Sequence, residues 1–203
     1  MTNDVKPVLY LVVCAAPPAL AVGGFVGLLQ QRGWTVCAIS TPRAATWMDL
    51  GALASQTGHP VRSEPRRPQD SDPLPRADAM AVVPATFNTI NKWAAGISDT
   101  LALGLLNEAI GLQLPITVAP CAKAALAAHP AFGESLRKLS EWGVRVLPNE
   151  IIRHAAEQNQ AADHSFAWSA AVAGIGPPAA FRTAETGPSP VAPGSSGARP
   201  TAD

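Results

Sequence analysis

Residues 79–92 read AMAVVPATFNTINK, in which an apolar run is followed by small, hydroxyl and amide side chains. The run 79–83 has the length and character of a buried strand, and the residues after Pro84 lead into a helix. In α/β proteins such a loop holds phosphorylated cofactors, because the start of the helix presents unpaired N–H groups. We therefore expect an α/β fold with its functional site at this loop.

Segments on both sides of this stretch alternate between strand and helix patterns. Continuous apolar runs predict strands at 8–14, 35–40, 79–83, 114–119 and 144–147. Helical spacing of apolar residues predicts helices at 19–31, 44–54, 89–95 and 131–142, and a further one that Asp99 caps and that runs through Leu106. Strands that alternate with helices imply a parallel sheet with right-handed crossovers. The predicted fold is α/β, a three-layer, Rossmann-like parallel sheet flanked by helices.

The length and composition of the chain are those of a single domain. The chain has 203 residues, of which 47% are hydrophobic and 15% charged, so it can build one sizeable core. We assign residues 1–182 to this domain and predict a disordered tail at 183–203, where Gly, Pro, Ser and Ala dominate. The charged, proline-rich stretch 62–76 is either an exposed connector or a loop that covers a substrate.

The net charge, the apolar runs and the spacing of cysteines and histidines argue against several kinds of partner. Fifteen basic and fifteen acidic residues cancel, so bulk charge attracts neither nucleic acid nor an anionic membrane. The first apolar run follows a polar segment, is broken by Pro17 and Pro18, and is too short to span a bilayer. Cys14, Cys37 and Cys121 show no paired or metal-ligand spacing, and the histidines show no zinc spacing. We expect a cytoplasmic protein with no metal site and with neither a nucleic-acid nor a membrane partner.

Four strand ends are the expected places for ligand contacts. Ligands of open parallel sheets bind beyond the carboxyl ends of the strands. In this chain those ends are the segments 15–17, 40–43, 84–88 and 120–123. The first two cysteines, Cys14 and Cys37, fall inside apolar strands and are predicted to be small core residues.

Residues 77–99, read ADAMAVVPATFNTINKWAAGISD, resemble the central stretch of the homo-oligomeric flavin-containing cysteine decarboxylases, typified by phosphopantothenoylcysteine decarboxylase. That family has Ala-Asp, an apolar strand, Pro-Ala-Ser/Thr-Ala-Asn-Thr-Ile-Ala-Lys, and then Gly-Ile-Ala-Asp. The resemblance extends over residues 8–147. It implies an FMN-binding domain, a cysteine-like small-molecule or peptide substrate, and a trimer or a multiple of trimers with flavin between the subunits.

The same resemblance indicates which residues contact the flavin or the substrate. We call residues 84–89 the central loop; the contacts expected from it are Pro84, Ala85, Thr86, Asn88 and Thr89. Weaker flavin contacts are expected from Ala15, Ser40 and Thr41. By residue type alone, Asn88 and Thr89 are better explained as helix caps, and the family resemblance reverses that preference. Trp47 and Trp93 either stack on the isoalloxazine ring or pack in the core or between subunits.

Three departures from the family pattern concern catalysis. The family histidine before the Ala-Asp pair has no counterpart, and Asp70 or Asp72 either replaces it or is simply exposed. Lys123 stands where the family has the asparagine that holds the substrate carboxylate, and it either pairs with that carboxylate or is a surface lysine. The later cysteine and glycine-rich segment of phosphopantothenoylcysteine decarboxylases has no counterpart after Leu147.

Two kinds of function follow from these observations. The first is FMN-dependent oxidative decarboxylation of a cysteine-containing substrate. The second is a flavin-binding protein that does not decarboxylate, such as an electron carrier, a flavin reductase or an assembly subunit. The loop 84–89 agrees with either, whereas the missing histidine and the altered segment 120–123, in which Lys123 replaces the family asparagine, favour the second.

Overall fold

The structure is a computed structural model that describes residues 6–67, 69–149, 151 and 168–178. Its centre is a five-stranded, entirely parallel sheet in the order β2-β1-β3-β4-β5. The strands are β1 (Val8–Val13), β2 (Thr35–Ser40), β3 (Ala79–Ala85), β4 (Ile116–Pro120) and β5 (Arg145–Val146). Every residue of β1, β3 and β4 is buried, which explains why these strands read as continuous apolar runs. The predicted three-layer α/β fold is confirmed.

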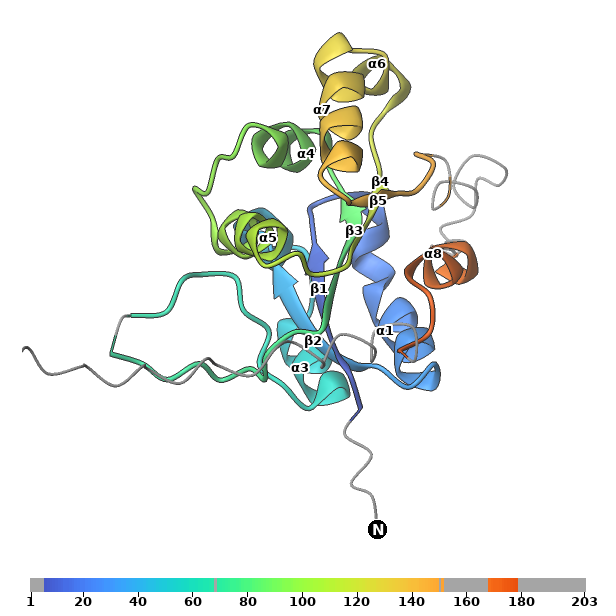
Figure 1. Ribbon diagram of the computed structural model, residues 1–203. Helices are drawn as coiled ribbons and strands as arrows, with labels where there is room; N and C mark the ends of the chain where they lie inside the picture. Colours follow the sequence, from blue (N-terminus) through green and yellow to red (C-terminus); the bar gives the residue numbers. More distant parts are fainter. Residues whose placement is uncertain (1–5, 68, 150, 152–167, 179–203) are drawn as a thin grey trace, which may run out of the picture.

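Helices cover both faces of the sheet (Figure 1). One layer contains α4 (Phe87–Ala94), α5 (Leu101–Gly111) and α7 (Pro130–Glu141), and the other contains α1 (Val22–Gln31), α3 (Leu50–Thr57) and α8 (Trp168–Ile175). Short helical turns follow three of the strands: η1 (Pro17–Ala21), α2 (Pro42–Ala45) and α6 (Ala124–Ala127). Alternate residues of each strand point to opposite faces, so Tyr10 packs with the first layer and Leu11 with the second.

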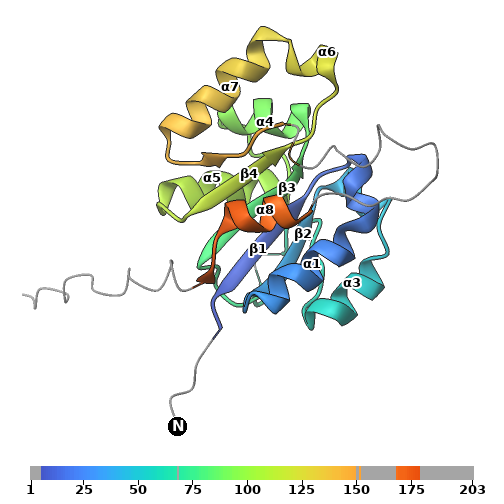
Figure 2. The ribbon, with the colours of Figure 1, turned by 90° about the vertical axis from the view of Figure 1, so that its right-hand side faces the viewer.

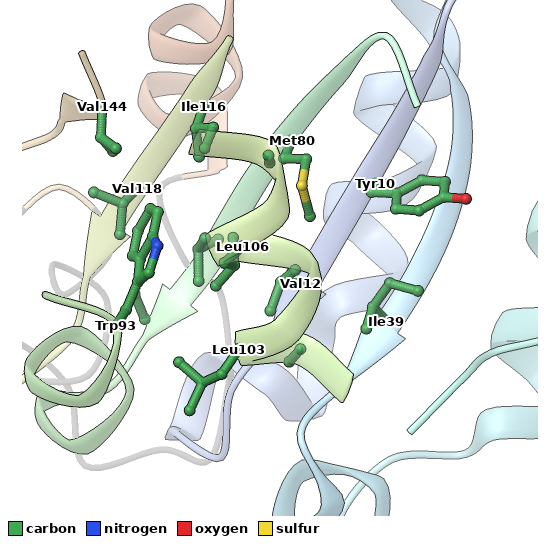
Figure 3. Packing of buried hydrophobic residues seen from close by; sticks show 14 of the residues in the cluster. Tyr10, Val12, Ile39, Met80, Trp93, Leu103, Leu106, Ile116, Val118 and Val144 are labelled. Atoms are coloured by element: carbon green, nitrogen blue, oxygen red, sulfur yellow. The ribbon is translucent and has the colours of Figure 1, made fainter. Parts of the chain in front are cut away.

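The first helical layer packs on the sheet through large side chains (Figure 3). Trp93 of α4 and Leu106 of α5 are completely buried and lie against strand residues such as Val118. Burying an apolar side chain of this size contributes about 1.5–3 kcal/mol to folding. Trp93 is therefore a core residue, and the alternative that it stacks on a flavin is excluded.

The second layer includes a helix that the sequence did not predict. Helix α8 lies beside α1, on the face away from α4 and α5 (Figure 2). The rings of Trp168 and Phe25 have their centroids 4.9 Å apart, and the Arg145 side chain donates a hydrogen bond to the Gly174 carbonyl oxygen at 3.0 Å. Helix α8 thereby extends the second helical layer from α1 to β4.

Several element boundaries differ from the prediction. The helix expected at 44–54 is two helices, α2 and α3, with a break at 46–49. Asp99 does not cap α5; Thr100 does, because its Oγ1 accepts a hydrogen bond from the Leu103 N–H at 3.2 Å. Strand β3 extends to Ala85, two residues beyond the predicted end.

The connector 62–76 has no helix or strand among its described residues, as predicted. It begins at the edge of the sheet, where Arg62 bridges to Ile39 of β2, and Figure 1 shows it swinging away from the sheet. An ion pair of 3.3 Å joins Arg62 to Asp72, and the Tyr10 Oη donates to the Pro75 carbonyl oxygen at 2.8 Å. The connector is thus tied to the body at both ends.

Within the described residues, no helix is long and apolar enough to cross a membrane. The predicted domain boundary at residue 182 and the predicted tail 183–203 lie outside the part of the chain that the structure describes.

Candidate functional site

A pocket of about 910 Å³ opens at the carboxyl edge of the sheet, where four strands end. All four predicted strand ends contribute to it. We call it the carboxyl-edge pocket; its lining comprises Ala15, Ala16, Pro17, Thr41, Pro42, Arg43, Trp47, Thr86, Phe87, Asn88, Thr89, Lys92, Asp99, Thr100, Leu103, Cys121, Ala122, Lys123 and Leu126. In the strand order found here, β2 is added on one side of β1 and β3 on the other, so the direction of winding reverses between β1 and β3; FMN binds at this switch point in flavodoxin-like sheets.

The loop after β3 presents hydroxyl groups to the pocket. Thr86 caps α4, because its Oγ1 accepts a hydrogen bond from the Thr89 N–H at 3.4 Å. The Thr86 and Thr89 hydroxyl oxygens lie 3.0 Å apart and share one hydrogen bond. Asn88 is exposed, and its amide has no hydrogen-bond partner within the described residues. The capping residue is therefore Thr86, and the Asn88 amide is available to a ligand.

Cys14 lies directly behind these two threonines. It is completely buried at the end of β1, and its N–H donates to the Pro84 carbonyl oxygen at 3.1 Å, which joins the ends of β1 and β3. Burial raises the pKa of the Cys14 thiol, and hydrogen bonds from the hydroxyls of Thr89 and Thr86 and the Thr86 backbone oppose that rise. The thiol therefore stays protonated, and its hydrogen bonds with Thr86 and Thr89 hold their hydroxyl groups in place. The prediction that Cys14 is a core residue is confirmed, but its contact with the threonines was missed.

The turns after β1 and β2 form one end of the pocket, and the segment after β4 forms the other. The Thr41 N–H donates to the Val13 carbonyl oxygen at 3.0 Å, and this bond fixes the second turn against the first. Ser40, next to Thr41, is completely buried, and its hydroxyl has no partner within the described residues. Leaving a buried hydroxyl without a hydrogen bond costs about 1–3 kcal/mol, and a phosphate oxygen is the kind of acceptor that would remove this cost.

The charges of the pocket favour an anionic ligand. Three cationic side chains line it, those of Arg43, Lys92 and Lys123, together with one carboxylate, Asp99. The Lys92 Nζ lies 2.5 Å from the Asp99 Oδ2, so these two charges neutralise each other. Among the described residues, neither Arg43 nor Lys123 forms an ion pair, which leaves the pocket with two unpaired positive charges in a chain of net charge zero. An anion such as a phosphate or a carboxylate fits this charge, as do the hydroxyls of the lining.

Not every residue singled out from the sequence reaches the pocket. Ala15, Thr41, Thr86, Asn88, Thr89 and Lys123 line it, whereas Ser40, Pro84 and Ala85 are buried behind the lining. Asp70 and Asp72 lie in the connector, outside the lining. The Asp70 carboxylate accepts a hydrogen bond from the Arg67 N–H at 3.3 Å, and Asp72 pairs with Arg62. Within this chain, neither aspartate takes the place of the family histidine at the pocket.

Other lining residues were missed because nothing in their local pattern distinguishes them. Arg43 lies in a predicted strand-end segment but received no role, and Lys92 and Asp99 lie in the family motif seven residues apart. Phe87, Leu103 and Leu126 look like ordinary core or surface side chains in the sequence. Trp47 was considered as a stacking residue, and it does line the pocket, with 40% of its surface exposed.

Known proteins resemble this chain in sequence. The model of the family described as Flavoprotein matches residues 4–170. The coenzyme A biosynthesis bifunctional protein CoaBC of Thermococcus kodakarensis is 31% identical over 154 residues, which cover 72% of this chain. A shorter match of 47 residues, 43% identical, is to the dihydromethanopterin reductase (acceptor) of Methanosarcina mazei; it covers 23% of this chain and 20% of that protein. The chain spans only 38% of the length of the Thermococcus protein.

Solved structures share the fold. The FMN-dependent cysteine decarboxylase SpaF superposes with a TM-score of 0.59 at 25% identity and covers 70% of this chain and 83% of its own. The FMN binding protein AtHal3 has the same fold, with a TM-score of 0.59 at 21% identity over 76% of this chain and 86% of its own. The resemblance to flavin-containing cysteine decarboxylases is thereby confirmed, and a flavin is the cofactor that the family indicates. Because the family match covers most of its residues, the chain belongs to the Flavoprotein family.

Proposed function

We propose that the carboxyl-edge pocket binds FMN and that the protein oxidatively decarboxylates a cysteine-containing small molecule or peptide. The observation that carries this proposal is the position of the pocket at the switch point between β1 and β3, lined by the threonine hydroxyls of the central loop and by unpaired cations. The structural neighbours support the same chemistry, since SpaF is an FMN-dependent cysteine decarboxylase.

The lining residues divide into two groups by their place along the sheet edge. Ala15, Thr41 and Arg43 follow β1 and β2, whereas Lys123 follows β4 at the other end. We assign the first group, together with the threonines of the central loop, to the flavin. Lys123 is assigned to the substrate, because its ammonium group can pair with the carboxylate that is to be lost. Asn88, with its unpaired amide, lies between the two groups.

FMN, when bound, would accept the two electrons and two hydrogens that the CH2–SH group of the substrate loses as it is oxidised to a thioaldehyde. The resulting thioaldehyde draws electrons from the neighbouring carbon, so the carboxylate can leave as CO2. Lys123 orients that carboxylate by charge. The Lys92–Asp99 pair keeps a second ammonium group from competing for it, since its charge is already balanced.

One observation favours the second candidate, a flavin-binding protein without decarboxylase activity. Within the described residues, the lining contains no histidine, and its single carboxylate, Asp99, is held by Lys92. A general base positioned near the substrate contributes about 100- to 10,000-fold to a proton-transfer step. A pocket without one still binds a flavin, as an electron carrier or an assembly subunit requires.

A copy of the same chain is proposed to complete the site. Trp47 and Leu126 are both large, apolar and about two-fifths exposed, and both line the pocket. Covering them against a second copy removes apolar surface from water, which is the main driving force for association. We propose a homo-oligomer, a trimer or a multiple of trimers, as the family resemblance implies. Sedimentation analysis tests this: a monomeric mass at micromolar concentration contradicts it.

The test of function combines a binding and a turnover measurement. The purified protein is titrated with FMN, and a peptide that ends in cysteine is then incubated with the complex under air and weighed by mass spectrometry. Loss of the mass of CO2 and two hydrogens supports the decarboxylase, with a serine-terminated peptide as the unreactive control. FMN binding without turnover of such peptides favours the second candidate, and absence of FMN binding contradicts both.

Lys123→Ala is the matched variant for the substrate assignment. It is expected to bind FMN normally and to raise the KM for the peptide about tenfold or more, because a charge-assisted hydrogen bond to the carboxylate is lost. Lys123→Arg keeps the charge and is expected to retain most of the affinity. A KM unchanged in Lys123→Ala contradicts the role of this residue.

A further inference from the structure

The turn after β1 offers few backbone donors to an anion. It is the start of η1, where Pro17 and Pro18 have no N–H. The Ala16 N–H donates to the Cys14 carbonyl oxygen at 2.9 Å, and the Ala19 N–H donates to the Ala16 carbonyl oxygen at 2.8 Å. Most of the N–H groups that would face a phosphate at this point are therefore absent or already used.

The turn after β2 has the same deficit. Pro42, the first residue of α2, lacks an N–H, and the Thr41 N–H is used by Val13. The Ala44 N–H donates to the Thr41 Oγ1 at 3.3 Å, and the Ala45 N–H to the Thr41 carbonyl oxygen at 3.0 Å. A doubly charged anion at this end of the pocket cannot be balanced by backbone amides alone and needs a cationic side chain.

Arg43 is the cation placed to supply that charge. It lines the pocket in α2, directly after β2, and forms no ion pair within the described residues. The other two cations of the lining are further along the sheet edge: Lys92 is paired with Asp99, and Lys123 follows β4, beyond β1 and β3. A guanidinium group carries five N–H donors in a planar fork that matches two phosphate oxygens at once.

We propose that Arg43 binds the phosphate of the flavin and determines the selectivity of the pocket for FMN over riboflavin. This inference rests on the proposed function, because it requires a flavin in the carboxyl-edge pocket. The side chain compensates for the amides that the three prolines remove: it contributes both the charge and the donors that a phosphate needs. The isoalloxazine ring, which the two flavins share, makes no use of Arg43.

The experiment measures the dissociation constants of FMN and riboflavin for the full-length apoprotein and for three variants. In Arg43→Ala the constant for FMN is expected to rise about 10- to 100-fold, while the constant for riboflavin stays the same. Arg43→Lys keeps the positive charge but not the planar guanidinium group, and its dissociation constant for FMN is expected to rise about tenfold or less. Lys123→Ala removes the same charge from the other end of the pocket, and we expect it to change the ratio of the two constants about twofold or less, as a distant exposed charge does.

Each outcome decides the proposal. The proposal is supported if Arg43→Ala loses affinity for FMN but not for riboflavin, if this loss is larger than in Lys123→Ala, and if the loss is larger at low salt than at high salt. Equal losses in the two variants attribute the effect to the overall charge of the pocket and overturn it, as does an unchanged ratio in Arg43→Ala. A wild-type protein that binds FMN and riboflavin equally also overturns it while leaving flavin binding intact. A wild-type protein that binds neither flavin overturns the proposed function and this inference together.

Discussion

At the level of single residues, two threonine hydroxyls at the start of α4 line the carboxyl-edge pocket and are proposed to contact the flavin. Thr86 and Thr89 share a hydrogen bond of 3.0 Å and rest on the buried Cys14 thiol. Thr86 also caps α4, so its side chain has a structural role in addition to the proposed binding role, whereas Thr89 caps nothing. The two residues are consequently distinguishable by mutation.

Thr89→Val is expected to weaken FMN binding about three- to tenfold, since one hydroxyl contact is lost without a change in shape. Thr86→Val should in addition lower the free energy of unfolding by about 1 kcal/mol, because the cap of α4 is lost. Fluorescence titration with FMN and urea denaturation measure the two effects. Thr117→Val is the control, a buried threonine of β4 that does not line the pocket. Equal FMN affinity in Thr89→Val and Thr117→Val would sink the assignment.

Tyr10 gives the protein a stability that depends on pH. Burial, and to a lesser degree the Asp72 carboxylate and Cys37, raise the pKa of Tyr10 from 10.0 to about 12, although Arg62 opposes them. Between these two values the folded protein keeps a proton that the unfolded chain has released. The stabilisation is therefore complete below pH 10 and is lost as the pH rises to about 12, a change of about 2–3 kcal/mol.

The measurement is direct because Tyr10 is the only tyrosine of the chain. We expect the absorbance of its phenolate to appear with a midpoint near pH 12 in the folded protein and near 10 in urea. Burial also raises the pKa of the Cys14 thiol and raises that of Cys37 to about 11, and both contribute a fall of the same sign, so the double variant Cys14→Ala, Cys37→Ala is the background for the stability series. A titration midpoint near 10 in the folded protein contradicts the prediction. In the stability series, Tyr10→Phe should remove most of the remaining dependence of the free energy of unfolding on pH between 10 and 12.

At the level of elements, the strands were predictable and α8 was not. Strands buried on both faces are continuous apolar runs, a pattern that is visible locally. Helix α8 reads WSAAVAGI, in which small and apolar residues occur on nearly all sides, so it lacks the one-sided periodicity of a surface helix. Two adjacent cap-forming residues, Asp99 and Thr100, likewise could not be told apart, because the ion pair to Lys92 that occupies Asp99 depends on the folded chain.

Helix α8 is predicted to be held mainly by Trp168. Its ring packs on Phe25 of α1, and its side chain is almost fully buried. Trp168→Ala should therefore lower the free energy of unfolding by about 3–5 kcal/mol, and Trp168→Phe by less, because less volume is removed. Urea denaturation followed by circular dichroism measures this. A loss below about 1 kcal/mol in Trp168→Ala would show that α8 contributes little to the packed core.

At the level of the whole molecule, ligand binding and stability are coupled. FMN binds only the folded chain in our proposal, since the pocket combines residues from the ends of four strands. At a free FMN concentration one hundred times the dissociation constant, the folded state gains about 2.7 kcal/mol. For a domain of this size the melting temperature should rise by about 5–10 °C.

Differential scanning calorimetry with FMN, and with riboflavin at the same concentration, measures this shift. Arg43→Ala should show a smaller shift with FMN at that fixed concentration and the wild-type shift with riboflavin. Absence of any shift in the wild-type protein at saturating FMN would contradict binding to the folded state.

Local sequence patterns predict the strands, most of the helices and the nature of the site. Apolar runs, helix caps and the motif Pro84–Thr89 are local, and neighbouring residues suffice to specify strand, loop and helix. The tertiary structure alone decided the strand order β2-β1-β3-β4-β5, and with it which distant side chains meet. Arg43 and Lys123 share one pocket, Cys14 supports two threonines more than seventy residues away, and Asp70 stays outside. Such contacts depend on where the chain crosses over the sheet, which no local pattern encodes.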